Sequence, residues 1–201
     1  YSLSHDVLGA VIEEVSGQTL GAYVKDHIFT PLGMKNTGFT LTQDQQERLS
    51  AQFTYREDQR TSDLIPSENI FVPSKNYESG GAGLASTADD YMLFLDAMCH
   101  DGMSAAGYRL LTPASIDRMR HDELHGKAKE DFALLGKVGY SYGLGVRTCV
   151  AREPYGIKSP LGEFGWDGAA GAYALIDTQH RLAVFYVQHV MNCDYVYRVI
   201  H

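Results

Sequence analysis

Apolar residues recur at helical spacing near the start of the chain. Residues 6–16 gather them on one helical face, and Gly17 follows at the position where a C-cap glycine is common. Residues 20–28 repeat the pattern, and the run Pro31-Leu32-Gly33-Met34 follows. The spacing therefore predicts two helices, the second of which reaches about Ile28 and is ended by residues 31–34.

Two further helices are predicted from their start signals. Thr87 precedes an acidic pair, as an N-cap does, and opens a helix that reaches about His100. Thr112 precedes a proline at the favoured first helical position, and this helix reaches about Arg120. Residues 43–79 are polar and weakly periodic, so we expect a long excursion with one or two short strands.

From residue 140 onward the apolar period shortens towards two, which is typical of strands. Strands are predicted over 142–150, 172–176 and 182–189. The polar residues 177–181 suggest a hairpin turn between the last two strands. A helical first part followed by a strand-forming last part favours an α+β fold.

The most distinctive run surrounds Trp166, the single tryptophan of the chain. Gly168, Ala169 and Gly171 leave the backbone here bare of large side chains, so another molecule can approach it closely. Such a strand beside a large aromatic ring suits recognition of a carbonyl group by main-chain N–H groups. The alternative is a tight turn that enters a core strand with a buried tryptophan.

Composition narrows the class of protein. The chain has 201 residues, 44% of them hydrophobic and 21% charged, as in an ordinary globular protein. Its net charge of −8 argues against a nucleic-acid partner, and its apolar stretches are too short to span a membrane. Cys99, Cys149 and Cys193 show no zinc spacing, and the histidines show no H-x-x-x-H spacing on any plausible helix. We therefore expect mostly buried free thiols, no metal and no cofactor.

Most catalytic motifs of common enzyme classes are missing from the chain. It contains no S-x-x-K, no P-loop and no H-E-x-x-H. Residues 139–143 match G-x-S-x-G in letters, but they lie where the apolar period is that of strands and not at a strand-to-helix turn. Motifs alone therefore favour an enzyme no more than a binding module.

The order of several segments is more specific than any one motif. Residues 1–9 with 13–17, then 31–39, 80–91 and 164–171 resemble, in this order, the serine esterase branch of the class C β-lactamase and penicillin-binding-protein superfamily. Together they span nearly the whole chain. The resemblance implies an acyl-enzyme mechanism with a serine in S-x-x-K, a catalytic tyrosine and a Lys-Thr-Gly-like strand.

The resemblance also assigns roles to residues of this chain. Tyr1 falls on the catalytic tyrosine, which shares with a lysine the removal of the serine proton. Trp166, Asp167 and Gly168 fall on the Lys-Thr-Gly position, where esterase members often carry Trp-x-Gly. The backbone N–H of Ala169 would supply one oxyanion-hole donor, and the serine itself the other.

Departures from the family pattern bear on the substrate. Leu3 stands where β-lactamase members place asparagine, and Trp166 stands where they place a cation. Both changes favour an uncharged ester or a small amide over a β-lactam. The S-x-x-K serine is expected upstream of Tyr1, so the chain by itself is expected to show no covalent turnover.

We therefore expect the C-terminal portion of an α+β class C β-lactamase/serine-esterase fold, an antiparallel sheet flanked by helices plus a helical subdomain. Residues 1–135 are expected to hold the rest of the helical subdomain with its long loop. Residues 136–201 would hold the last strands of the sheet domain and the start of the closing helix. The chain is expected to be part of a serine hydrolase that acts as an esterase, with weak β-lactamase or D-amino-acid peptidase activity as further candidate activities. The alternative is a non-catalytic penicillin-recognising or ligand-binding module, or an inactive fragment.

The partners expected are correspondingly few. The substrate would be a small-molecule ester, amide or β-lactam, with no nucleic acid and no membrane span. An open apolar sheet along residues 173–187 predicts self-association or pairing with a missing N-terminal portion. The compartment, cytoplasmic or exported, is left open.

Overall fold

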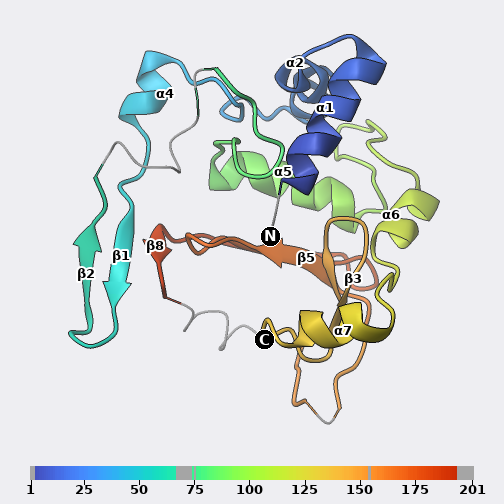
Figure 1. Ribbon diagram of the computed structural model, residues 1–201. Coiled ribbons are helices and arrows are strands. Elements are labelled where there is room, and N and C mark those ends of the chain that lie inside the picture. The colour runs from blue at the N-terminus through green and yellow to red at the C-terminus, as the bar shows by residue number, and fades with distance from the viewer. Residues whose placement is uncertain (1–2, 67–73, 75, 154, 194–201) are drawn as a thin grey trace. The chain divides into compact units, whose positions relative to one another are not determined.

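A computed structural model describes residues 3–66, 74, 76–153 and 155–193 of the chain (Figure 1). The chain forms two compact units, Tyr1–Phe94 and Leu95–His201, and each is described by itself. The predicted boundary after residue 135 concerns the subdomains of the family fold and stays a prediction. The expected start of the closing helix, from residue 194, lies outside the described residues.

The first unit consists of helices and one β-hairpin. Its elements are α1 (Ser4–Ser16), α2 (Leu20–Val24), the π-helical turn η1 (Lys25–Phe29), α3 (Thr30–Leu32), α4 (Gln43–Glu47), β1 (Phe53–Arg56), β2 (Thr61–Leu64) and the first turns of α5 (Ala88–Cys99).

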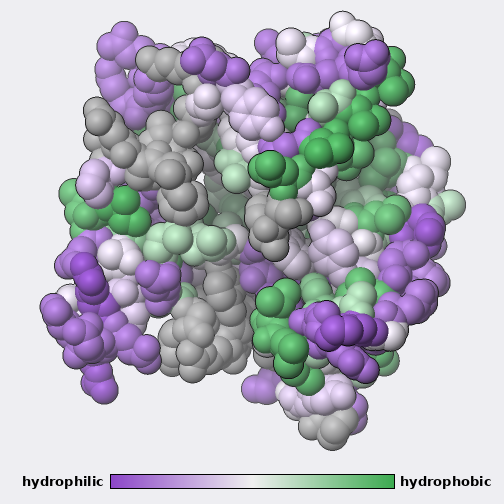
Figure 2. All heavy atoms as spheres, viewed as in Figure 1, coloured by the Kyte–Doolittle hydropathy of each residue, from purple (hydrophilic) through white to green (hydrophobic). Residues whose placement is uncertain are grey.

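Helix α1 confirms the first sequence prediction. Gly17 adopts the left-handed conformation (φ 69°), and its N–H donates to the Glu13 carbonyl at 2.9 Å. The apolar stripe of the helix, however, faces outward, and Figure 2 shows hydrophobic side chains over α1. Val7 and Val11 are both more than half exposed, and Val15 is 83% exposed. The pattern therefore identified the helix but not a buried face in this chain.

The second helical segment extends past Ile28, its predicted last residue, but ends within the predicted terminating residues 31–34. Helix α2 continues into the wider π-helical turn η1, in which the Thr30 N–H donates to the Lys25 carbonyl five residues back. Pro31 then lies in the first turn of α3, where its missing N–H costs little. Gly33, in the predicted terminating run, ends the helical segment with φ 79°.

The polar excursion contains more structure than its periodicity indicated. Strands β1 and β2 pair antiparallel, with Phe53 opposite Leu64, and confirm the expected short strands. Helix α4 was not predicted, because it has no apolar stripe. Its signal was a capping box, in which Thr42 accepts from the Gln45 N–H at 3.2 Å and the Gln45 side chain accepts from the Thr42 N–H at 2.9 Å.

Helix α5 begins where the cap signal placed it. The Thr87 hydroxyl accepts a hydrogen bond from the Asp90 N–H at 3.2 Å. The buried Asp90 carboxylate also accepts from the Asn36 N–H at 2.6 Å and from the Thr37 hydroxyl at 2.8 Å. This acid therefore fixes the loop after α3 to the helix, beyond any interaction with the helix dipole.

The second unit contains the main sheet. Its elements are the last turns of α5, α6 (Pro113–Met119), α7 (Gly126–Ala133), β3 (Tyr140–Tyr142), β4 (Arg147–Cys149), β5 (Phe164–Asp167), β6 (Tyr173–Asp177), β7 (Leu182–Tyr186) and β8 (Val190–Met191). The strands β3-β4-β5-β6-β7 lie in this order and pair antiparallel, and α7 packs against β3 (Figure 1). Thr112 caps α6 as predicted, and the sheet confirms the α+β plan.

Two of the strand predictions need correction. The single strand expected over 142–150 is a hairpin, because Gly145 (φ 80°) turns the chain between β3 and β4. At Gly143 a Cβ would lie 2.0 Å from the Met119 carbonyl oxygen, which leaves room only for glycine. The strand expected over 182–189 ends at Tyr186, and β8 follows separately. Helix α7 was not predicted at all.

The β6–β7 hairpin confirms the predicted turn. The Asp177 carboxylate accepts from the N–H groups of Gln179 (2.9 Å) and His180 (3.2 Å), which holds the turn closed. All residues of β6 are buried, so the open apolar face expected along 173–187 is narrower than predicted. The exposed apolar residues of this range lie on the edge strand β7 and directly after it, where Leu182 is 49% and Val187 is 46% exposed. Self-association through these residues stays a prediction.

Among the described residues, no helix is both long enough and apolar enough to cross a bilayer.

Gly165 in the middle of β5 gives a first testable prediction. A Cβ at this position would lie 2.0 Å from the Ala174 carbonyl oxygen and 3.3 Å from Nη1 of Arg147. We expect Gly165→Ala to lower the free energy of unfolding by about 2 kcal/mol, measured by urea titration, because the neighbouring strands must move apart. Gly168→Ala is the matched control, since its Cβ would meet its nearest atom at 3.7 Å. Equal urea midpoints for the two variants would contradict this expectation.

Candidate active site

Trp166 lies on β5, half-buried, with one side of its ring against a hydrophobic cluster. This cluster comprises Phe132, Tyr140, Cys149 and Ile157. The ring centroid lies 5.3 Å from that of Tyr142, edge to face, and 6.4 Å from that of Phe132. Both interpretations of Trp166 therefore hold in part. One side of the ring packs in the core, as a buried tryptophan would, and the residue remains partly exposed, as a recognition surface requires.

The chain turns directly after β5. The Gly171 N–H donates to the Gly168 carbonyl at 2.9 Å, and the Gly168 N–H donates to the Ala172 carbonyl at 2.7 Å. This closes a β-turn with Ala169 and Ala170 at its centre, and the N–H groups at the centre of such a turn take no part in closing it. Within the described ranges the Ala169 N–H makes no hydrogen bond, and the residue is exposed. It is therefore an available donor next to Trp166.

Asp167 is paired with a lysine that the sequence did not single out. Nζ of Lys137 lies 2.5 Å from the Asp167 carboxylate and 5.7 Å from the centroid of the Trp166 ring. The two charged side chains are only 14% and 18% exposed. A cation thus lies near the position where β-lactamase members carry one, but Asp167 neutralises it. No local motif marks Lys137, since the contact joins positions 30 residues apart.

Two buried charged residues, Arg147 and Glu163, lie next to β5 in the sheet. Arg147 on β4 and Glu163 just before β5 have no exposed side-chain surface, and their charged groups are 3.9 Å apart. Both terminal nitrogens of Arg147 donate to the Ala174 carbonyl at 3.2 Å. The guanidinium also lies 4.5 Å from the Tyr173 ring centroid and 5.7 Å from that of Tyr140.

Burial sets the protonation preferences of this cluster. It raises the pKa of the Glu163 carboxyl, while the Arg147 charge and the Tyr140 hydroxyl act in the opposite direction. Burial likewise raises the pKa of Tyr173 to about 12 and that of Cys149 to about 11. These hydroxyl and thiol groups are therefore protonated at neutral pH and are not poised as nucleophiles. Of the three free cysteines, Cys99 and Cys149 are buried and Cys193 is partly buried, as expected.

The remaining predicted site residue, Tyr1, lies outside the described residues, so its position relative to Trp166 is not part of the structure. Trp166, Asp167, Gly168 and Ala169 are brought together by being consecutive in the chain. Two cavities of about 540 and 360 Å³ occur in the first unit, and none of these four residues lines either of them.

Comparison with known proteins places the chain in a family. The family model described as Beta-lactamase matches residues 1–194. Protein Rv1367c of Mycobacterium tuberculosis is 31% identical over 94% of this chain and 48% of its own length. Esterase EstB of Burkholderia gladioli is 29% identical over 92% of this chain and 47% of its own length.

A solved structure agrees in fold. EstCE1, described as a hydrolase with promiscuous acyltransferase activity, superposes with a TM-score of 0.80 over all of this chain and 54% of its own, at 23% identity. The chain thus spans about half the length of the relatives that it matches. Because the family model covers nearly every residue, the chain belongs to the Beta-lactamase family.

Proposed function

We propose that this chain supplies one wall of the active site of a serine hydrolase that cleaves uncharged esters through an acyl-enzyme. The observation that carries the proposal is the Ala169 N–H, which is exposed, unused within the described residues and adjacent to the half-buried Trp166. A main-chain donor beside an apolar ring suits an ester carbonyl flanked by an apolar acyl group. The proposal concerns the longer protein, since the nucleophile comes from an S-x-x-K segment that this chain lacks.

The proposed reaction assigns each group one task. The serine oxygen attacks the ester carbonyl carbon, and its proton passes to the pair formed by a lysine and Tyr1. The carbonyl oxygen becomes negative and accepts hydrogen bonds from the N–H groups of Ala169 and of the serine itself. The carbon–oxygen bond to the alcohol then breaks, and Tyr1 returns the proton to the leaving oxygen. Water then attacks the carbonyl carbon of the acyl-enzyme by the same steps, the bond to the serine oxygen breaks, the serine regains its proton, and the acid is released.

The electrostatics of the wall support an uncharged acyl group. Asp167 holds the Lys137 ammonium at 2.5 Å, so this cation is not available to pair with a substrate carboxylate. Penicillin-like substrates carry such a carboxylate and would lose that interaction. D-amino-acid peptidase action would need the same partner, and we therefore place it second to ester hydrolysis.

The direct test compares substrates on the longer protein that includes this chain. We expect a short-chain p-nitrophenyl ester to be hydrolysed with a kcat/KM at least about 100-fold above that for a chromogenic cephalosporin. A fluorophosphonate probe is expected to label one serine, the S-x-x-K serine, with loss of fluoride. Labelling of a serine within this chain, or preferred hydrolysis of the cephalosporin, would overturn the proposal. An added alcohol tests whether the acyl group is also transferred, as the description of EstCE1 suggests.

Substrate charge gives a second prediction. We expect Asp167→Asn to raise kcat/KM for an ester with a carboxylate on its acyl group by about 5- to 10-fold relative to a neutral ester, because Lys137 is then free to pair with it. The ratio of the two rates is measured in steady-state assays. Lys137→Met in the Asp167→Asn background is the control and is expected to restore the original ratio. If Asp167→Asn leaves the ratio of kcat/KM for the charged and the neutral ester unchanged, Lys137 does not contact the acyl group of the substrate.

A further inference from the structure

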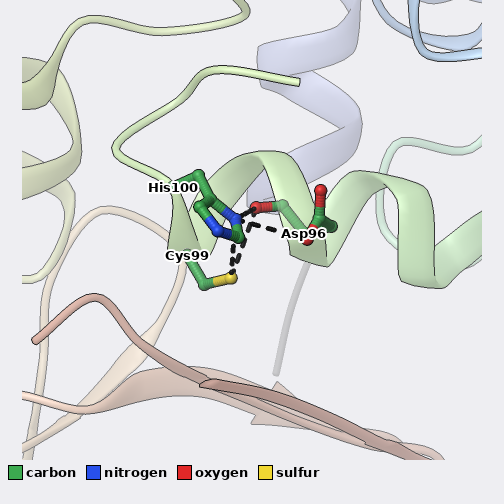
Figure 3. Close-up of side chains that lie close together, drawn as sticks. All are labelled: Asp96, Cys99 and His100. Atoms are coloured by element: carbon green, nitrogen blue, oxygen red, sulfur yellow. Dashed lines mark hydrogen bonds and ion pairs between the residues drawn. The ribbon is translucent and has the colours of Figure 1, made fainter. Parts of the chain in front are cut away.

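We propose that Asp96, Cys99 and His100, at the end of α5, form a binding site for a borderline-soft divalent cation such as Zn²⁺. Across the described residues, these are the one set of three metal-ligating side chains whose ligand atoms all lie within 4.8 Å of one another. Figure 3 shows the sulfur of Cys99 and the imidazole of His100 directed towards each other, with Asp96 one helical turn earlier. The site is separate from Trp166–Ala169 and independent of the proposed hydrolase activity.

The distances between ligand atoms match those around a tetrahedral zinc ion. Sγ of Cys99 lies 3.4 Å from Nδ1 of His100, and that nitrogen lies 3.3 Å from Oδ1 of Asp96. With zinc–sulfur bonds of about 2.3 Å and zinc–nitrogen or –oxygen bonds of about 2.0 Å, tetrahedral angles place these pairs about 3.5 and about 3.3 Å apart. Two edges of the coordination tetrahedron are therefore already formed.

The third edge can close through Asp96. Its side chain is 43% exposed, so the carboxylate has room to rotate towards the sulfur. The His100 side chain is 38% exposed, which leaves an approach for a cation, whereas Cys99 is 2% exposed and supplies the buried ligand. Three protein ligands leave a fourth position for water.

Binding requires defined exchanges of protons and hydrogen bonds. Nδ1 of His100 now lies 2.9 Å from the Asp96 carbonyl oxygen, and the Cys99 thiol donates to the same oxygen at 3.3 Å. A cation would take the Nδ1 lone pair, leave the ring proton on Nε2, and displace the thiol proton to solvent. The remaining charged groups near the thiol are Asp101 and Arg181, which oppose each other.

Cobalt(II) titration of the chain under reducing conditions tests the site. We expect one Co²⁺ per chain, a thiolate-to-cobalt charge-transfer band in the near ultraviolet, and loss of that band when Zn²⁺ is added. His100→Ala and Asp96→Asn, at partly exposed positions, are each expected to weaken Co²⁺ binding about tenfold or more. Cys99→Ser is expected to abolish the band.

Two controls keep the proposal falsifiable. Cys193→Ser and His121→Ala change a partly buried thiol and an exposed imidazole elsewhere, and both are expected to leave the band and the Co²⁺ affinity unchanged. Should Cys99→Ser fail to fold, His100→Ala and Asp96→Asn still decide the question. Absence of the band in the unmodified chain, its loss in Cys193→Ser, or unchanged affinity in His100→Ala would each overturn the assignment.

Discussion

Replacing Ala169 with proline is expected to lower kcat/KM for ester hydrolysis by the longer protein by about 10²- to 10³-fold. Proline removes the backbone N–H, and loss of one oxyanion-hole donor has an effect of this size. The turn itself tolerates the change, because Ala169 is the second residue of a β-turn closed between Gly168 and Gly171, and proline is favoured there. Gly168, which would precede the proline, has no side chain to clash with its ring.

Ala169→Gly is the matched control, since it changes the side chain but keeps the N–H. We expect this variant to retain activity within about threefold. Thermal unfolding of both variants separates a catalytic effect from a folding effect, and we expect a shift of no more than a few degrees for proline, as a change of about 1 kcal/mol would give. Full activity of a folded Ala169→Pro protein would remove the N–H from the proposed mechanism.

The chain folds as an α+β member of the Beta-lactamase family, and much of its secondary structure could be predicted because the signals are local. Thr87, Thr112 and Gly17 each bond to backbone within four residues, so a cap alone identifies the helix end. Helix α4 was not predicted because its residues are all polar and form no apolar stripe. Its capping box was readable from Thr42 and Gln45.

The predictions that failed depend on contacts between distant residues. Gly145 turns the chain between β3 and β4, and this turn packs against a distant segment, because the Leu144 N–H donates to the Met119 carbonyl at 2.8 Å and that oxygen leaves no room for a Cβ at Gly143. The burial of Arg147 is a similar case, because its partners lie on other strands. A charged residue in a strand is normally read as facing solvent.

The candidate site was predictable only in part for the same reason. The order of segments placed Trp166, Asp167, Gly168 and Ala169 on a family position, and their roles remain a proposal. Lys137 could not be found this way, since its pairing with Asp167 joins a loop to β5. The set Asp96, Cys99 and His100 escaped notice because its spacing on one helix follows no familiar metal motif.

The largest loss of stability is expected from Arg147→Met, at about 3–5 kcal/mol in the free energy of unfolding measured by urea titration. Methionine fills similar volume, but it leaves the Glu163 carboxylate buried without its cation. It also removes two hydrogen bonds to the Ala174 carbonyl and the contact with the Tyr173 ring. Arg56→Met is the control, because its ion pair with Asp63 is about half exposed on both sides and is expected to contribute less than about 1 kcal/mol.

The dependence of this loss on pH identifies its cause. Burial already raises the pKa of Glu163 in the folded chain, and removing the Arg147 charge removes the strongest opposing influence. A carboxyl whose pKa is higher in the folded than in the unfolded state stabilises the fold at low pH and loses that contribution as pH rises through the folded pKa. The Arg147→Met chain is therefore expected to gain stability, relative to the unmodified chain, when the pH is lowered from neutral towards 5. Adding Glu163→Gln to Arg147→Met is expected to recover about 1–3 kcal/mol at neutral pH and to abolish the pH dependence, because no buried charge then remains to be protonated. If the single and double variants unfold at the same urea concentration throughout this range, the loss comes from packing alone and Glu163 carries no uncompensated charge.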